Sequence, residues 1–128
     1  MEPREIEVCA VVGGRDVDPA TIEQHLGLTG NYNWRRRDGD DVEWGVRHVV
    51  HTLFLTEPVE FVLDLIEGVG DQWRKLAETH EDWEFSLICT VDMSDAFLSH
   101  EQFPVLALSH SVIARIGSLG LEFDIVFK

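Results

Sequence analysis

The segment that most constrains the fold of this chain covers residues 56–80. Its apolar side chains recur at alternating spacings of three and four, which places them on one side of a helix: Val59, Val62, Ile66, Val69, Trp73 and Leu76. Thr56 is a suitable N-cap, and Pro58 fits the first turn, where its missing N–H costs no hydrogen bond. Gly68 and Gly70 each weaken a helix by roughly 1 kcal/mol relative to Ala, so we expect a kink or break there. The rest of the chain must supply a layer that covers this apolar side.

Strand-like patterns lie on both sides of this segment. Alternating apolar and polar residues predict strands at 5–12, 31–37, 42–55, 83–91, 103–108 and 121–127. The Asp38-Gly39 pair between the second and third of these is a strong hairpin signal, and Gly13-Gly14 is expected to end the first strand. Two further helices are predicted, a short one that begins at Asp18-Pro19 and a last one over residues 109–119.

The order of these elements predicts an α+β fold. Strand pairs joined by hairpins alternate with helices, which favours a single, mainly antiparallel sheet of about six strands with helices packed on one face. At 128 residues the chain has the length of one domain, and it shows no repeat, low-complexity segment or linker that would divide it. We therefore expect residues 1–128 to form one domain, with Trp73 buried against the sheet.

The chain is strongly acidic, with 24 Asp and Glu residues against 10 Lys and Arg residues and a net charge of −14. This charge argues against binding to nucleic acid or to an anionic membrane, because phosphate groups would be repelled. Two interpretations stay open. An acidic surface can meet a basic protein partner and speed its association, or the acidity can serve solubility or the internal conditions of the host.

The sequence pattern indicates a cytoplasmic protein. No apolar run approaches the roughly 20 residues that span a bilayer, and the charged residues 1–8 do not resemble a signal peptide. Cys9 and Cys89 each lie in a strand-like pattern and are expected to be buried free thiols.

A basic patch on the predicted hairpin is the local cluster best suited to a ligand. Arginines beside aromatic rings can hold a carboxylate, a phosphate or a planar group through bidentate hydrogen bonds and stacking. The candidate ligand-binding residues are Trp34, Arg35, Arg37, Trp44 and Arg47. In the competing interpretation, the arginines pair with the acidic residues of the turn and the tryptophans belong to the core.

The sequence carries no motif typical of catalysis or metal binding. His48 and His51 are three residues apart on a predicted strand, so their side chains point to opposite faces and do not share one ion. The nucleophile, phosphate-loop and zinc-protease motifs do not occur. Asp124 is either a buried carboxylate that needs an arginine or backbone donors, or an exposed strand residue. We predict no catalytic residue, no metal and no cofactor, and whether the protein is an enzyme is left open.

Short motifs spread over nearly the whole chain resemble those of a known family. They are Asp18-Pro19-x-x-Ile22-x-x-x-Leu26-Gly27-Leu28, Trp34 with its basic neighbours, Trp44-Gly45, and Ile113-x-x-Ile116-x-x-Leu119-Gly120-Leu121-x-x-Asp124-Ile125. In these motifs the chain resembles an uncharacterised family of small bacterial proteins that is catalogued as the domain of unknown function number four-two-seven-nine. The resemblance implies a small bacterial cytoplasmic protein and brings no catalytic residues.

Two functions from different classes follow from these patterns. The first is a non-enzymatic interaction or binding module that leaves one face or edge of its sheet for a protein partner, for instance as the neutralising partner of a basic toxin such as a nuclease. The alternative is a small-molecule sensor or enzyme that binds an anionic ligand at the hairpin between Trp34 and Arg47. A concave pocket with converging polar groups at that hairpin would favour the second function, and a flat acidic surface would favour the first.

Overall fold

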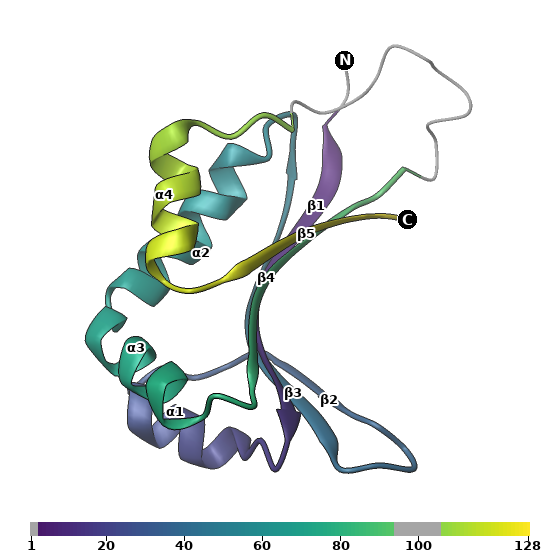
Figure 1. The fold of residues 1–128 in the computed structure, drawn as a ribbon. Helices are drawn as coiled ribbons and strands as arrows, with labels where there is room; N and C mark the ends of the chain where they lie inside the picture. Colours follow the sequence, from purple (N-terminus) through teal and green to yellow (C-terminus); the bar gives the residue numbers. More distant parts are fainter. Residues whose placement is uncertain (1–2, 94–105) are drawn as a thin grey trace.

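The computed structural model describes residues 3–93 and 106–128. Figure 1 shows its elements, which in chain order are β1 (Arg4–Arg15), α1 (Pro19–Leu26), β2 (Tyr32–Arg35), β3 (Asp41–Thr52), α2 (Thr56–Glu67), α3 (Gly70–Thr79), β4 (Glu84–Val91), α4 (His110–Ser118) and β5 (Glu122–Phe127). The α+β class predicted from the sequence is confirmed.

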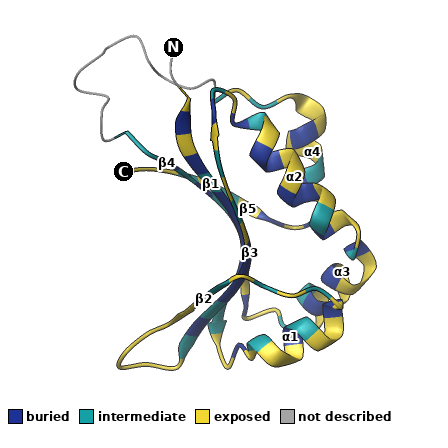
Figure 2. Cartoon of the chain, turned by 180° about the vertical axis from the view of Figure 1, so that it is seen from behind, coloured by how far each residue is buried: buried dark blue, intermediate teal, exposed yellow. Residues whose placement is uncertain are grey.

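The strands of the described residues form one sheet in the order β2-β3-β1-β4-β5. Neighbouring strands are antiparallel except β4 and β5, which run parallel. A parallel neighbour requires a crossover connection, and α4 lies in the segment that links these two strands. Figures 1 and 2, seen from opposite sides, place the described helices together on one side of the sheet. The predicted two-layer arrangement is therefore present.

The hydrophobic core lies between the sheet and the helices. The central strand β1 points four side chains with 0% exposure toward the helices: Ile6, Val8, Ala10 and Val12. The helix α2 meets them with Val59, Val62, Leu63 and Ile66, which are equally buried. Fully burying a Val, Leu or Ile side chain contributes about 1.5–3 kcal/mol, so this interface is the main source of stability.

Residues 56–80 form two helices rather than one, as the glycines predict. The first, α2, ends at Glu67, and α3 begins at Gly70. Trp73 of α3 is fully buried, and its indole N–H donates to the Leu119 carbonyl oxygen at 3.1 Å. Its ring meets Phe85 of β4 edge-on, with centroids 5.5 Å apart. The expected burial of Trp73 against the sheet is thus confirmed.

The prediction of about six strands is wrong, because the sheet of the described residues has five. Residues 106–108 of the expected strand at 103–108 are not in a strand, and residues 103–105 lie outside the described part. The Ala107 carbonyl oxygen instead accepts a hydrogen bond from the Thr56 hydroxyl at 3.2 Å, and Leu106 and Leu108 pack on the core. This contact also explains why Thr56 does not cap α2, whose N-cap is Leu55.

The strand β1 is longer than the sequence predicts. It continues through Gly13-Gly14 to Arg15 and pairs with β3 over its whole length. Gly14 has a φ of 146°, and a Cβ at this position would lie 3.2 Å from Cδ1 of Trp83. Only glycine adopts this conformation easily beside such a ring. The glycine pair therefore lets the strand pass a bulky neighbour instead of ending it.

Candidate binding surface

The face of the sheet turned away from the helices, here called the outer face, is the candidate binding surface. Alternate residues of a strand point to opposite faces, and the register fixes which ones point outward. Among the described strands and the residues that directly follow them, its charged residues are Glu5, Glu7, Arg15, Asp41, Glu43, Arg47, Glu84, Asp92, Glu122, Asp124 and Lys128. Among these residues, eight carboxylates thus stand against three basic side chains. Asp124 is exposed, which is the second of the two alternatives left open by the sequence.

Ion pairs leave this face negative. Among the described residues, Arg47 Nη1 lies 3.4 Å from Glu7 Oε1, and Arg36 Nη1 lies 3.5 Å from Asp41 Oδ2. Both pairs are partly exposed to water, and such pairs contribute only about 0–1 kcal/mol. The remaining carboxylates produce a negative potential that attracts cations and basic proteins.

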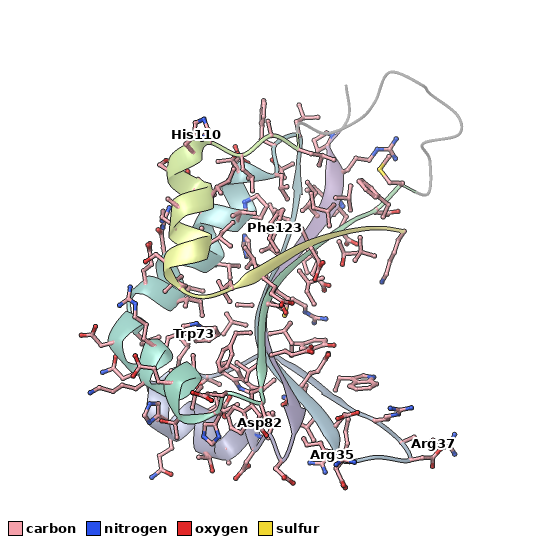
Figure 3. The ribbon with its side chains drawn as sticks, in the orientation of Figure 1. Arg35, Arg37, Trp73, Asp82, His110 and Phe123 are labelled. Atoms are coloured by element: carbon pink, nitrogen blue, oxygen red, sulfur yellow. The ribbon has the colours of Figure 1, made fainter. Side chains whose placement is uncertain are left out.

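A groove of about 450 Å³, here called the hairpin groove, opens on the outer face beside the β2–β3 hairpin. Its lining residues are Gly13, Gly14, Arg15, Trp34, Asp41, Val42, Glu43, Asp82 and Glu84. Four of them are carboxylates and one is an arginine, and Figure 3 shows Asp82 close to the foot of the hairpin. The Trp34 ring is 46% exposed and provides an aromatic wall. Carboxylates accept charge-assisted hydrogen bonds and indole rings attract cations, so the groove suits a cationic group.

A tyrosine fixes one of the groove carboxylates. The Tyr32 hydroxyl donates to Glu43 Oε1 at 2.8 Å. Burial and this hydrogen bond raise the pKa of Tyr32 to about 12, so the hydroxyl stays protonated and remains a donor at physiological pH. Gly13 opposite leaves the carboxylate room, because a Cβ there would lie 3.3 Å from Glu43 Cγ. The position of the Glu43 side chain is therefore set before any ligand arrives.

A second hollow shows that the acidity extends along the outer face. It has a volume of about 220 Å³ and lies where the end of β4 meets the start of β1. Its lining residues are Glu5, Glu7, Thr90, Asp92 and Lys128. The hairpin groove is thus one end of a longer acidic surface.

The structure separates the five residues that the sequence predicts as an anion site. Trp34 and Arg47 lie on the outer face, Trp34 in the hairpin groove and Arg47 beside Glu7. Arg35 points to the opposite side of the hairpin from Trp34, because consecutive strand residues alternate. Arg37 lies in the turn, and Figure 3 shows it at the tip of the hairpin. These residues do not surround one common position.

Trp44, the fifth of these residues, belongs to the core, as in the competing interpretation. It has 0% exposure and lies on the helical side of β3. Its indole N–H donates to Glu23 Oε2 at 3.2 Å, and the Gly30 N–H donates to the same oxygen at 2.6 Å. Trp44 therefore ties α1 and the following loop to the sheet and is closed to a ligand.

Sequence reasoning missed most of the hairpin groove. The sequence pattern predicts a strand end at Gly13-Gly14 and gives no signal that singles out Asp82 or Glu84. A glycine pair inside a strand pattern is also typical of a place where another group approaches the backbone closely. That signal could have indicated the groove, whereas the approach of Asp82 to Trp34 depends on the tertiary fold.

Two histidines of the described residues stack on aromatic rings. His48 and His51 point to opposite faces of β3, as predicted. The His48 ring stacks on Phe61 with centroids 4.0 Å apart, and the His80 ring stacks on Trp83 at 3.6 Å. Within residues 3–93 and 106–128, no group of three or more His, Cys, Asp or Glu side chains is arranged to hold a metal ion.

Comparisons with known proteins provide no relative from which a function can be transferred. No protein-family model matches the chain. No curated protein and no solved structure matches it either. The resemblance to the uncharacterised bacterial family therefore stays a prediction. Among the helices of the described part of the chain, none is long and apolar enough to cross a membrane.

Proposed function

We propose that the protein is a non-enzymatic binding module that docks a basic protein partner on the outer face of its sheet. The observation that carries this proposal is the hairpin groove, where four carboxylates and the exposed Trp34 ring line one hollow. An arginine or lysine of the partner fits this lining, because the carboxylates accept its hydrogen bonds and the indole ring stacks on the cation. In a narrower form of the proposal, the partner is a basic toxin such as a nuclease, which the module neutralises.

The charge of the whole chain supports the same kind of partner. A net charge of −14 steers a basic protein toward the module and raises the association rate, an effect that salt weakens. The groove then supplies the local contacts that steering alone does not give. Long-range attraction and short-range fit therefore favour the same partner chemistry.

The alternative, an anionic ligand at the hairpin, has less support. Arg35 lies on the opposite side of the hairpin from Trp34, Arg37 does not line the hairpin groove, and Arg47 lies beside Glu7. The hollow next to Trp34 is lined by carboxylates, which repel a phosphate or carboxylate ligand. We therefore prefer the cationic partner.

The proposal is tested with a short oligo-arginine peptide as the probe, titrated calorimetrically into the protein. The variant Asp82→Asn with Glu84→Gln removes two groove charges while keeping the size of both side chains, and both residues are exposed. Because each lost carboxylate removes a charge-assisted hydrogen bond, we expect about tenfold weaker binding of the peptide. Trp34→Ala should weaken binding in the same way.

A matched control separates the groove from general acidity. Glu60→Gln with Glu78→Gln changes the net charge equally, on exposed positions of α2 and α3. This control should bind the peptide as the wild type does. Equal weakening of both double variants would contradict the proposal, and stabilisation of the wild type by phosphate, lost in Arg35→Ala with Arg37→Ala, would support the anion alternative.

A further inference from the structure

The backbone of β5 is arranged to accept another strand. The Lys128 N–H donates to the Val91 carbonyl oxygen at 3.0 Å, and the Lys128 carbonyl oxygen accepts from the Met93 N–H at 2.7 Å. Backbone groups alternate in direction along a strand, so the even-numbered residues of β5 bond to β4. The odd-numbered residues point their N–H and C=O groups away from the sheet: Phe123, Ile125 and Phe127. Among the described strands, β5 has a neighbour on one side only.

The two edges of the sheet differ in how they are protected. Edge strands of soluble proteins avoid pairing by being short or by carrying charges. At the other edge, β2 has four residues and runs into a turn of arginines and aspartates. By contrast, β5 has six residues and carries apolar side chains at four of them. Its edge is therefore the one suited to pairing.

An apolar surface lies beside this edge and is called the β5 patch here. A hollow of about 330 Å³ between α4 and β5 is lined by Leu106, Leu108, Ile113, Ile116 and Phe123. Of these residues Ile113 is 54% exposed, and Phe127, further along β5 on the same face as Phe123, is 55% exposed. Apolar side chains that gather on a surface in this way are typical of an interaction site.

We infer that the β5 patch binds a second copy of this chain through antiparallel β5–β5 pairing. A two-fold axis at Ile125 places Phe123 opposite Phe127 of the second copy, and Glu122 opposite Lys128 of the second copy. The charged pair occurs twice on the outer face, and unlike charges directly opposite each other favour pairing. On the helical side, Phe127 of one copy lies beside the hollow of the other. The strand is thus complementary to itself in both charge and apolar surface.

Charge disfavours one of the two neighbouring registers. In the register centred on Ile125, Phe123, Ile125 and Phe127 all exchange backbone hydrogen bonds with the second copy. A shift that centres the pairing on Asp124 places two aspartates directly opposite each other, which is unfavourable. A shift that centres it on Val126 replaces the Glu122–Lys128 pair with an Asp124–Lys128 pair and places Val126 opposite itself, so that a cysteine at position 126 would link to its own copy. The inference does not depend on the proposed function, because β5 pairs through its edge, whereas no residue of β5 lines the hairpin groove.

The first test is the mass of the protein in solution, measured by light scattering over a range of micromolar concentrations. We expect the wild type to reach twice the chain mass of 14.6 kDa. Glu122→Lys alone, or Lys128→Glu alone, should weaken dimerisation about tenfold, because two attractive pairs become repulsive. An equal mixture of the two variants should recover the dimer, because each supplies the charge that the other lacks. Glu60→Lys, a control on α2 with the same charge change as Glu122→Lys, should dimerise like the wild type.

The second test determines the register with disulfides. Asp124 and Val126 are exposed and would lie opposite each other across the interface, where Cα atoms are about 4.5 Å apart, within disulfide reach. Under oxidation, a mixture of Asp124→Cys and Val126→Cys proteins should form a linked heterodimer, and neither protein should link to itself. The native Cys9 and Cys89 are buried, so they should not form disulfides between copies under these conditions. A wild type that stays monomeric at every concentration, or Asp124→Cys protein that links to itself, would overturn the inference.

Discussion

Trp44 and Trp73 each have 0% exposure, and each donates its indole N–H to a partner in another part of the chain. Trp34, by contrast, exposes 46% of its surface on the outer face. The same residue type thus serves the core in one place and the candidate site in another. Burial distinguishes the two roles. Substitution of a buried tryptophan should lower the stability strongly, and substitution of Trp34 should lower it little.

Trp73→Ala should lower the free energy of unfolding by roughly 3–5 kcal/mol, because it leaves a large cavity and an unbonded Leu119 carbonyl oxygen. Chemical denaturation measures this loss. Trp34→Ala serves as the control and should cost less than about 1 kcal/mol, since exposed positions contribute little. A loss below about 1 kcal/mol for Trp73→Ala would mean that its burial in the core is wrong.

The two cysteines should be inert in the folded protein. Burial raises the pKa of Cys9 and of Cys89 from 9.0 to about 12, and the Glu7 carboxylate adds to the effect at Cys9. The reactive species is the thiolate, so at about pH 8 a thiol reagent should label neither residue in the native protein and both after unfolding. Rapid labelling of one native thiol would contradict the assigned burial.

The same pKa shifts predict a loss of stability at high pH. Unfolded thiols ionise near pH 9.0, whereas the folded ones stay neutral up to about pH 12. A raised pKa in the folded state contributes stability that is complete below pH 9.0 and is lost as the pH rises toward 12. Urea unfolding at a series of pH values should therefore show a decline over this window that is smaller in Cys89→Ala. An equal decline in that variant would exclude a contribution from Cys89.

Among the elements, the connection from α1 to β2 depends on a close approach. A Cβ on Gly30 would lie 2.3 Å from Nε1 of the buried Trp44 and 2.8 Å from the Gly45 carbonyl oxygen. Gly30→Ala should therefore destabilise the protein by about 1–3 kcal/mol through overpacking. Gly117 of α4 is the matched control, because nothing lies within 4 Å of its Cβ position. Gly117→Ala should stabilise the helix by about 0.5–1 kcal/mol. Thermal melting should therefore show a lower melting temperature for Gly30→Ala and a higher one for Gly117→Ala.

The sequence pattern predicts elements well where the signal is local. The break between α2 and α3 follows from Gly68 and Gly70, and the cap of α1 follows from Asp18, whose Oδ1 accepts from the Ala20 N–H at 3.2 Å. The non-strand conformation of residues 106–108 and the extension of β1 through Gly14 depend on contacts with α2 and Trp83, which are distant in the sequence. Patterns of neighbouring residues cannot predict such long-range contacts.

The candidate site shows the same limit. Strand alternation predicts the separation of Arg35 from Trp34 and of His48 from His51, because it depends on register alone. The meeting of Trp34 with Asp82 in one groove requires the order of the strands, which short patterns do not determine. The sequence pattern therefore groups Trp34 with arginines, whereas in the structure it lines a groove with four carboxylates.

For the whole molecule, charge and architecture point to the same surface. The described helices lie on one side of the sheet (Figure 2), and the described residues of the outer face include eight carboxylates against three basic groups. The central claim is that this face, through the hairpin groove, recognises a basic partner.

The measurement that tests this claim most directly is a map of amide and indole chemical shifts during titration with the oligo-arginine peptide. We predict that the largest changes cluster at Gly13, Gly14, Glu84 and the Trp34 indole N–H, because these groups line one groove. Signals of α2 and α3, on the opposite side of the sheet, should move little although their acidic residues are just as exposed. Changes spread evenly over all acidic residues, or centred on the helices, would contradict the account.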